Sequence, residues 1–191
     1  MNRKLFKKAI PNLLTSFRCI SALIVPILII YGDEIGAKLA PIIFIIASFT
    51  DFFDGYFARK FDVISNFGKV VDPVADKMLV IGNLFALGSE NFFNFHYTFI
   101  PAFIIVLREI LITGLREQLS EEKIVINVST LAKWKTTIQL IACSSYLIWR
   151  SDEILFNSII IEYICIVLIW IAALITIITC LDYLKKIGDY L

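Results

Sequence analysis

The chain has 191 residues, with 18 Lys and Arg against 17 Asp and Glu, so its formal net charge is +1. Hydrophobic residues make up 59% of it and its mean hydropathy is +0.81, whereas a soluble domain is about 45–50% apolar. This excess excludes an ordinary soluble domain and indicates an integral membrane protein, for which we expect no nucleic-acid partner.

Six apolar blocks of helical length follow one another along the chain. They span about residues 10–32, 36–59, 70–89, 98–119, 130–149 and 154–183. A membrane-spanning helix needs about 20 residues, and an open sheet cannot satisfy its backbone polar groups in lipid. The sequence therefore predicts an all-α, polytopic membrane protein with six transmembrane helices, in a single domain over residues 1–191.

The distribution of Lys and Arg predicts the orientation. Residues 1–8 are basic and predict a short amphipathic segment lying on the anionic inner leaflet. Further basic residues cluster after the second and fourth blocks and at the C-terminus, whereas only Lys38 and Arg150 flank the opposite connections. Because loops rich in Lys and Arg stay in the cytoplasm, both termini are predicted to be cytoplasmic.

Four carboxylates interrupt the second and third blocks. Asp51 and Asp54 are three residues apart, and Asp72 and Asp76 are four apart, so each pair lies on one helix face. An ionised Asp at mid-bilayer costs about 2.5–3.5 kcal/mol on insertion scales, so four of them indicate a function. Carboxylate oxygens suit Mg²⁺ or Mn²⁺, although a proton or sodium path, or hydrogen bonds between helices, would also explain them.

Small residues and one cation accompany the acids. Gly55, Ala58 and Gly68 would let a ligand or a neighbouring helix approach the backbone closely. Arg59 could meet a phosphate or extend to the membrane surface. These residues favour a metal site that also binds a phosphorylated ligand, although close helix packing alone would explain the small ones.

The complete motif resembles that of a known enzyme family. It reads Asp51-x2-Asp54-Gly55-x2-Ala58-Arg59-x8-Gly68-x3-Asp72-x3-Asp76. At every fixed position it is similar to the motif of the CDP-alcohol phosphotransferases. The resemblance implies a homodimeric, six-helix membrane enzyme that moves a phosphatidyl or similar group from a CDP-linked donor to an alcohol and releases CMP.

The resemblance also implies a role for each residue of the motif. A pair of divalent ions, Mg²⁺ or Mn²⁺, would be held by Asp51, Asp54, Asp72 and Asp76. Asp76 would in addition be the catalytic residue that accepts the proton of the attacking hydroxyl. The cytidine diphosphate moiety would lie against Asp51, Asp54, Gly55, Ala58, Arg59 and Gly68.

Three polar segments outside the motif are candidates for binding the acceptor. They are residues 11–18, 107–117 and 132–137, which open the first block, cross the fourth and open the fifth. Their basic residues could form a pocket for an acceptor that is itself a phosphate ester. Alternatively, Lys133 and Lys135 are membrane anchors and Arg108 pairs with Glu109 or Glu117.

These segments are similar to those of the bacterial phosphatidylglycerophosphate synthase subfamily. The resemblance implies CDP-diacylglycerol as donor and sn-glycerol 3-phosphate as acceptor, in a bacterial inner (plasma) membrane. The distribution of Lys and Arg predicts that the active site lies near the cytoplasmic face of that membrane. The implied acceptor or phosphate ligands are Thr15, Arg18, Arg108, Arg116, Lys133 and Lys135.

Other acceptors and one other protein class remain alternatives. Phosphatidylglycerol would make the protein a cardiolipin synthase of the same family, and serine or inositol phosphate are further options. An ion- or proton-coupled transporter would also place acids in membrane helices. It would be expected to show repeats or broken central helices, and neither is visible in the sequence.

Overall fold

The computed structural model describes the backbone of residues 3–61, 66–89, 98–122, 124, 130–151 and 159–188. Within these ranges it describes the side chains of all residues except 3–11, 51–61, 66, 67, 69, 89, 130, 132 and 133.

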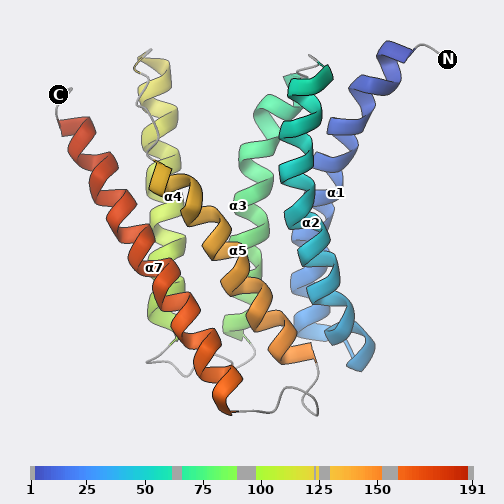
Figure 1. Cartoon of the computed structure of the whole chain (residues 1–191), viewed down its shortest axis with the longest axis vertical. Coiled ribbons are helices and arrows are strands. Elements are labelled where there is room, and N and C mark those ends of the chain that lie inside the picture. The colour runs from blue at the N-terminus through green and yellow to red at the C-terminus, as the bar shows by residue number, and fades with distance from the viewer. Residues whose placement is uncertain are drawn as a thin grey trace. The chain divides into compact units, whose positions relative to one another are not determined.

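The described part of the chain is all-helical, as the sequence predicts (Figure 1). Its helices are α1 (Arg3–Tyr31), α2 (Glu34–Phe61), α3 (Asn66–Ser89), α4 (Ile100–Glu121), α5 (Thr130–Ser151) and α7 (Ile159–Gly188). One boundary differs from expectation, because α1 begins at Arg3 and not near residue 10. The basic N-terminal residues therefore form the first turns of α1, continuous with the apolar block that follows them.

The helices belong to two compact units. The first comprises Met1–Phe92 and Leu147–Phe156, and therefore holds α1, α2 and α3. The second comprises Phe93–Tyr146 and Asn157–Leu191, and holds α4, α7 and most of α5. Each unit contains its own group of charged side chains that are paired within the protein.

In the first unit, α1 turns directly into α2. A Cβ atom on Gly32 would lie 2.2 Å from the carbonyl oxygen of Leu28, so only glycine fits at the end of α1. The next residue, Asp33, caps the start of α2 because its Oδ1 accepts a hydrogen bond from the backbone N–H of Gly36 at 3.0 Å. This two-residue connection makes α1 and α2 antiparallel neighbours.

A glycine also sets the approach of α3 to α1. A Cβ atom on Gly82 would lie 3.2 Å from the carbonyl oxygen of Ala22 and 3.4 Å from Cγ of Pro26. Any larger side chain would press on the backbone of α1. The small residue therefore lets two helices pack closely, as is common between membrane helices.

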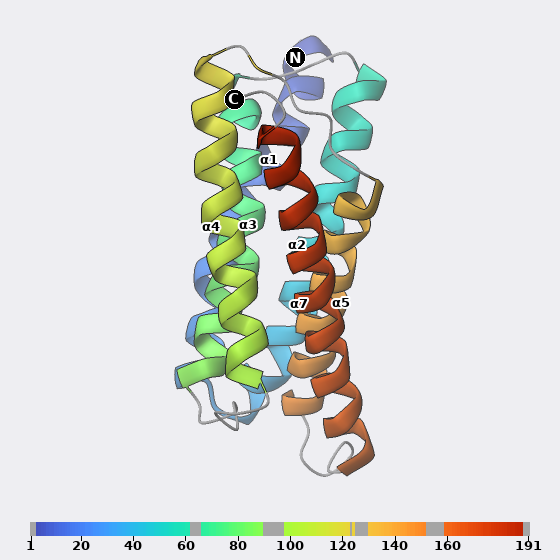
Figure 2. The same ribbon diagram turned by 90° about the vertical axis from the view of Figure 1, so that its left-hand side faces the viewer.

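In the second unit, α7 packs against both other helices (Figure 2). Ile112 and Leu119 of α4 form a buried cluster with Tyr183 and Ile187 of α7. A buried hydrogen bond also joins α7 to α5. Gln139 Nε2 of α5 donates to Thr176 Oγ1 at 3.0 Å.

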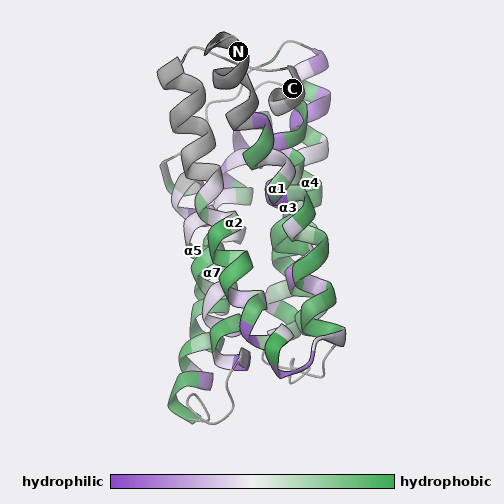
Figure 3. Cartoon of the chain, turned by 90° about the vertical axis from the view of Figure 1, so that its right-hand side faces the viewer, coloured by the Kyte–Doolittle hydropathy of each residue, from purple (hydrophilic) through white to green (hydrophobic). Residues whose placement is uncertain are grey.

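The surfaces of these helices suit a lipid environment. Within the described residues, Asn12–Tyr31 of α1 and Ile159–Gly188 of α7 are long and apolar enough to cross a membrane. Hydrophobic residues predominate along the helices in Figure 3, and large side chains such as Leu23 and Ile164 are more than half exposed. A soluble monomer rarely exposes large contiguous apolar surface, so these faces support the membrane prediction.

Candidate active site

The two acids of α3 meet two polar residues of α1. Thr15 Oγ1 donates a hydrogen bond to Asp72 Oδ1 at 2.5 Å. Three residues further along α1, Arg18 Nη1 donates to Asp76 Oδ1 at 2.6 Å and forms an ion pair with it. Because both residue numbers increase together, α1 and α3 run in the same direction and present one polar face to each other.

Burial differs sharply across this contact. Thr15 and Arg18 are almost completely buried, whereas the Asp76 side chain is 34% exposed. A buried guanidinium is costly unless an anion compensates it, and Asp76 supplies that charge. The α1 side of the contact is thus enclosed by protein, and the carboxylate on the α3 side remains accessible.

The remaining members of the motif lie largely outside the described side chains. The motif residues between 51 and 59 belong to α2, which contacts α3. Those whose side chains are not described are Asp51, Asp54, Gly55, Ala58 and Arg59. Gly68 is described and is buried in the first turn of α3. The CDP site and half of the metal site therefore stay predictions.

The described acids have the chemistry that a divalent ion requires. Asp72 and Asp76 offer hard oxygen donors from one face of α3, which suits Mg²⁺ or Mn²⁺. A carboxylate has about four lone-pair sites, so a hydrogen bond from α1 leaves it able to bind a cation. Among the described side chains, no group of three or more His, Cys, Asp or Glu gathers at one point, but two of the four predicted ligands are not among them.

A second group of charges is buried between α4 and α5. Glu109 Oε1 accepts a hydrogen bond from Lys135 Nζ and another from Arg108 Nη1, the latter at 3.3 Å. The side chains of Arg108, Glu109 and Lys135 are only 8%, 9% and 5% exposed. Two cations thus share one carboxylate, and the three side chains together carry one positive charge.

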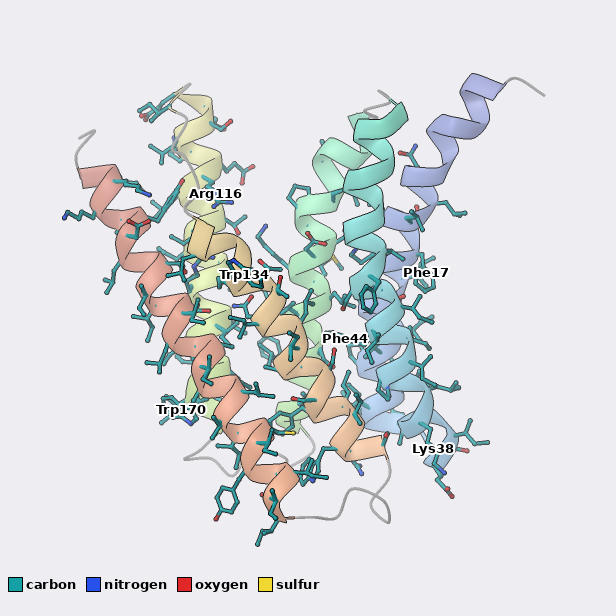
Figure 4. The ribbon with its side chains drawn as sticks, in the orientation of Figure 1. Phe17, Lys38, Phe44, Arg116, Trp134 and Trp170 are labelled. Atoms are coloured by element: carbon teal, nitrogen blue, oxygen red, sulfur yellow. The ribbon has the colours of Figure 1, made fainter. Side chains whose placement is uncertain are left out.

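The other predicted acceptor ligands of this region are placed differently. Arg116 is exposed on α4, and its Cζ lies 5.4 Å from the centre of the Tyr183 ring of α7 (Figure 4). This is a cation–π contact. The side chain of Lys133 lies outside the described residues. The structure therefore brings Arg108 and Lys135 together and directs Arg116 toward α7.

The sequence did not predict all the partners of Glu109. Glu109 was recognised as a possible partner of Arg108, but its bond to Lys135, which lies 26 residues away on α5, was not expected. The contact of Arg116 with Tyr183 was also missed. The only available signal was an acid next to an arginine inside an apolar block, because an unpaired buried arginine would be unstable.

Comparison with known proteins shows the family to which the chain belongs. Residues 8–178 match the family model of the CDP-alcohol phosphatidyltransferases. The chain is 38% identical over 185 residues to a CDP-diacylglycerol–glycerol-3-phosphate 3-phosphatidyltransferase of Rickettsia typhi, covering 96% of this chain and 99% of the relative. Proteins of the same name from Rickettsia bellii and Haemophilus influenzae are each 40% identical, over 95% and 92% of this chain and 96% and 91% of theirs.

The chain therefore belongs to the CDP-alcohol phosphatidyltransferase family. This confirms the resemblance carried by the acid motif and by the three flanking segments. It also confirms the prediction of a membrane enzyme that transfers a phosphatidyl group, in preference to a transporter.

Proposed function

We propose that this enzyme transfers the phosphatidyl group of CDP-diacylglycerol to sn-glycerol 3-phosphate, giving phosphatidylglycerophosphate and CMP in phospholipid biosynthesis. One observation carries the choice of substrates. Relatives named for this reaction align with nearly the whole chain, over the flanking polar segments as well as the acid motif. The shared acid motif alone would support any alcohol as acceptor.

Divalent-metal dependence is general in this family. Here Asp51, Asp54, Asp72 and Asp76 would hold two ions, either Mg²⁺ or Mn²⁺. When bound, the ions neutralise the diphosphate and improve CMP as a leaving group. The four acids are suited to binding two divalent cations. Without cations, the repulsion among four carboxylates in a medium of low dielectric constant would be strong.

Asp76 is the proposed general base. A bond forms between the acceptor hydroxyl oxygen and the phosphatidyl phosphorus, the bond from that phosphorus to CMP breaks, and the hydroxyl proton passes to Asp76. The 34% exposure of the Asp76 side chain is compatible with such contact. Gly55, Ala58, Arg59 and Gly68, together with Asp51 and Asp54, are proposed to line the cytidine diphosphate site.

The acceptor phosphate is proposed to bind the basic residues of α4 and α5. Arg108 and Lys135 share Glu109, so this cluster carries a net positive charge that a phosphate ester would neutralise. Serine as acceptor would bring no phosphate to use that charge. Arg116 and Lys133 are the further candidates, while Thr15 and Arg18 contact the acids of α3.

We also propose a topology and an assembly for the enzyme in the membrane. All six helices would span the inner (plasma) membrane of a bacterium as one domain, with both termini and the active site on the cytoplasmic side. The lipid donor would enter from the bilayer and the soluble acceptor from the cytoplasm. Two copies of the chain would form a homodimer.

An assay of CMP release from the purified protein tests the proposal. CDP-diacylglycerol is supplied with glycerol 3-phosphate, phosphatidylglycerol, serine or inositol phosphate in separate reactions. We expect release with glycerol 3-phosphate, its loss on chelation of metal, and recovery when Mg²⁺ or Mn²⁺ is restored. Release with serine but not with glycerol 3-phosphate would overturn the choice of acceptor, and full activity of Asp76→Asn would overturn the role of the acids.

A further inference from the structure

We propose that Thr15 and Arg18 are positioning residues that hold the carboxylates of Asp72 and Asp76 for a divalent cation. The sequence assigns them to the acceptor or lipid phosphate instead. The inference rests on the proposed function, because it takes the acids of α3 to be metal ligands. It concerns a different helix, however, since α1 contributes nothing to the acid motif itself.

The geometry of the contact carries the inference. Thr15 and Arg18 lie on one face of α1, and each donates to Oδ1 of an acid on one face of α3, at 2.5 and 2.6 Å. A single bond of this kind limits the rotation of a carboxylate. Two bonds from one rigid helix fix both carboxylates relative to each other, which is what a shared cation requires.

Burial makes the acids, and not their partners on α1, the accessible side of this contact. Thr15 is 0% and Arg18 is 1% exposed, whereas the acids that they contact are half-buried. A water-soluble acceptor would therefore reach the acids more readily than the residues behind them. Outer partners of metal ligands typically change metal affinity or activity by about 10–100-fold when they are removed.

A simpler role for Arg18 makes the opposite prediction. If it served only as a counter-charge to the acids, removing it would make the site more negative and would tighten cation binding. If it positions Asp76, removing it releases the carboxylate and weakens cation binding. The sign of the change in metal affinity therefore separates the two roles.

The experiment measures Mn²⁺ affinity of the purified, substrate-free protein by electron paramagnetic resonance. We expect Thr15→Val and Arg18→Met each to weaken binding by about 10–100-fold. Thr15→Ser restores the hydroxyl and should restore most of the affinity. Arg18→Lys keeps a charged donor but lacks the planar fork of the guanidinium, so its recovery should be partial.

Two neighbouring residues provide matched controls. Ser16 donates its hydroxyl to the carbonyl oxygen of Asn12 within α1, at 2.8 Å, so Ser16→Ala removes a hydroxyl next to Thr15 without touching an acid. Lys77 donates to the carbonyl oxygen of Pro73, at 2.6 Å, so Lys77→Met removes a cation next to Asp76 in sequence. Neither control should weaken Mn²⁺ binding.

Steady-state kinetics then separate positioning from acceptor binding. Positioning predicts a lower kcat with little change in the KM for glycerol 3-phosphate. A raised KM for glycerol 3-phosphate with unchanged Mn²⁺ affinity would overturn the inference in favour of acceptor binding. If Arg18→Met bound Mn²⁺ more tightly, Arg18 would act only as a counter-charge to the acids. That result would also overturn its positioning role.

The outcomes also distinguish this inference from the proposed function. A wild-type protein that releases no CMP with glycerol 3-phosphate contradicts the proposed acceptor, yet the Mn²⁺ measurements still decide the role of α1. A wild-type protein that binds no Mn²⁺ overturns the inference itself. Thr15→Val preserves the branched shape of the side chain, so it decides the question even if Arg18→Met does not fold.

Discussion

The two compact units bury charge in opposite ways. In the first unit, Asp72 and Asp76 outnumber Arg18, so these three side chains together carry one negative charge. In the second unit, Arg108 and Lys135 outnumber Glu109, so these three together carry one positive charge. An excess of negative charge favours a cation as ligand, and an excess of positive charge favours an anion. The proposed metal and acceptor phosphate correspond to these two signs.

The units also differ in how closed these groups are. Asp76 keeps a third of its side-chain surface exposed, whereas no member of the second group exceeds 9%. The acids of the first unit can therefore meet a ligand with little rearrangement. The charges of the second unit support one another, so we expect their loss to affect folding before it affects binding.

The largest expected effect is on the stability of the second unit. Glu109→Gln would leave Arg108 and Lys135 buried beside each other without an anion, and should lower the free energy of unfolding by about 3–5 kcal/mol. Denaturant unfolding in detergent micelles would measure this change. The control is Glu34→Gln, which breaks an exposed pair with Lys38 and should cost less than about 1 kcal/mol. Equal effects of the two substitutions would remove the proposed difference between the units.

In the first unit, Asp72→Asn should change stability little and reduce activity strongly. Its partner Thr15 is neutral and can donate equally well to an amide oxygen, so stability should change by less than about 1 kcal/mol. CMP release should fall by more than about 100-fold, because loss of this proposed metal ligand should exceed the roughly 10–100-fold effect of losing an outer partner. The same unfolding measurement and the CMP assay check both parts. Strong destabilisation with retained activity would show that this acid is structural.

A smaller effect is expected where α3 approaches α1. Gly82→Leu would press on the backbone of Ala22 and should cost about 1–3 kcal/mol, with reduced CMP release because Asp76 is displaced from Arg18. In the second unit, Gly114 has open space around it. Gly114→Leu should therefore leave stability unchanged or raise it by up to about 1 kcal/mol. Thermal unfolding of both variants would test whether close packing is confined to the first of these positions.

The smallest effect concerns the contact of α5 with α7. Thr176→Val removes the acceptor of Gln139, together with a bond from Thr176 to the carbonyl oxygen of Ala172 in its own helix. Hydrogen bonds between membrane helices contribute about 0.6 kcal/mol on average and about 1.7 kcal/mol at most, so the substitution should cost about 1 kcal/mol. Ser48→Ala in the first unit removes only a bond to the carbonyl oxygen of Phe44 in its own helix, and should cost less. If Ser48→Ala proved the more damaging in denaturant unfolding, hydrogen bonds within a helix would matter more here than those between helices.

The helices could be predicted from the sequence because apolar blocks of the right length alternate with polar breaks. Their ends were less predictable, since α1 includes basic residues that the hydropathy pattern placed outside it. Spacing also placed Asp72 and Asp76 on one face of a helix, and the structure pairs both with α1.

Contacts between distant helices could not be predicted. Thr15 and Arg18 are 57 and 58 residues from the acids that they contact, and which residues meet depends on the register of α1 against α3. A polar residue in an apolar block signals that it needs a partner, but it does not identify that partner. For this reason the sequence assigned both residues to a ligand, and the structure assigns them to the acids.

The pairing of Arg18 with Asp76 has a consequence for how the protein is made. The arginine leaves the ribosome 58 residues before its partner, which at about 5–20 residues per second is a delay of about 3–12 s. During that time α1 carries a cation without the carboxylate that compensates it, which is unfavourable inside an apolar segment. The first helix should therefore settle at its final depth only after the third has arrived.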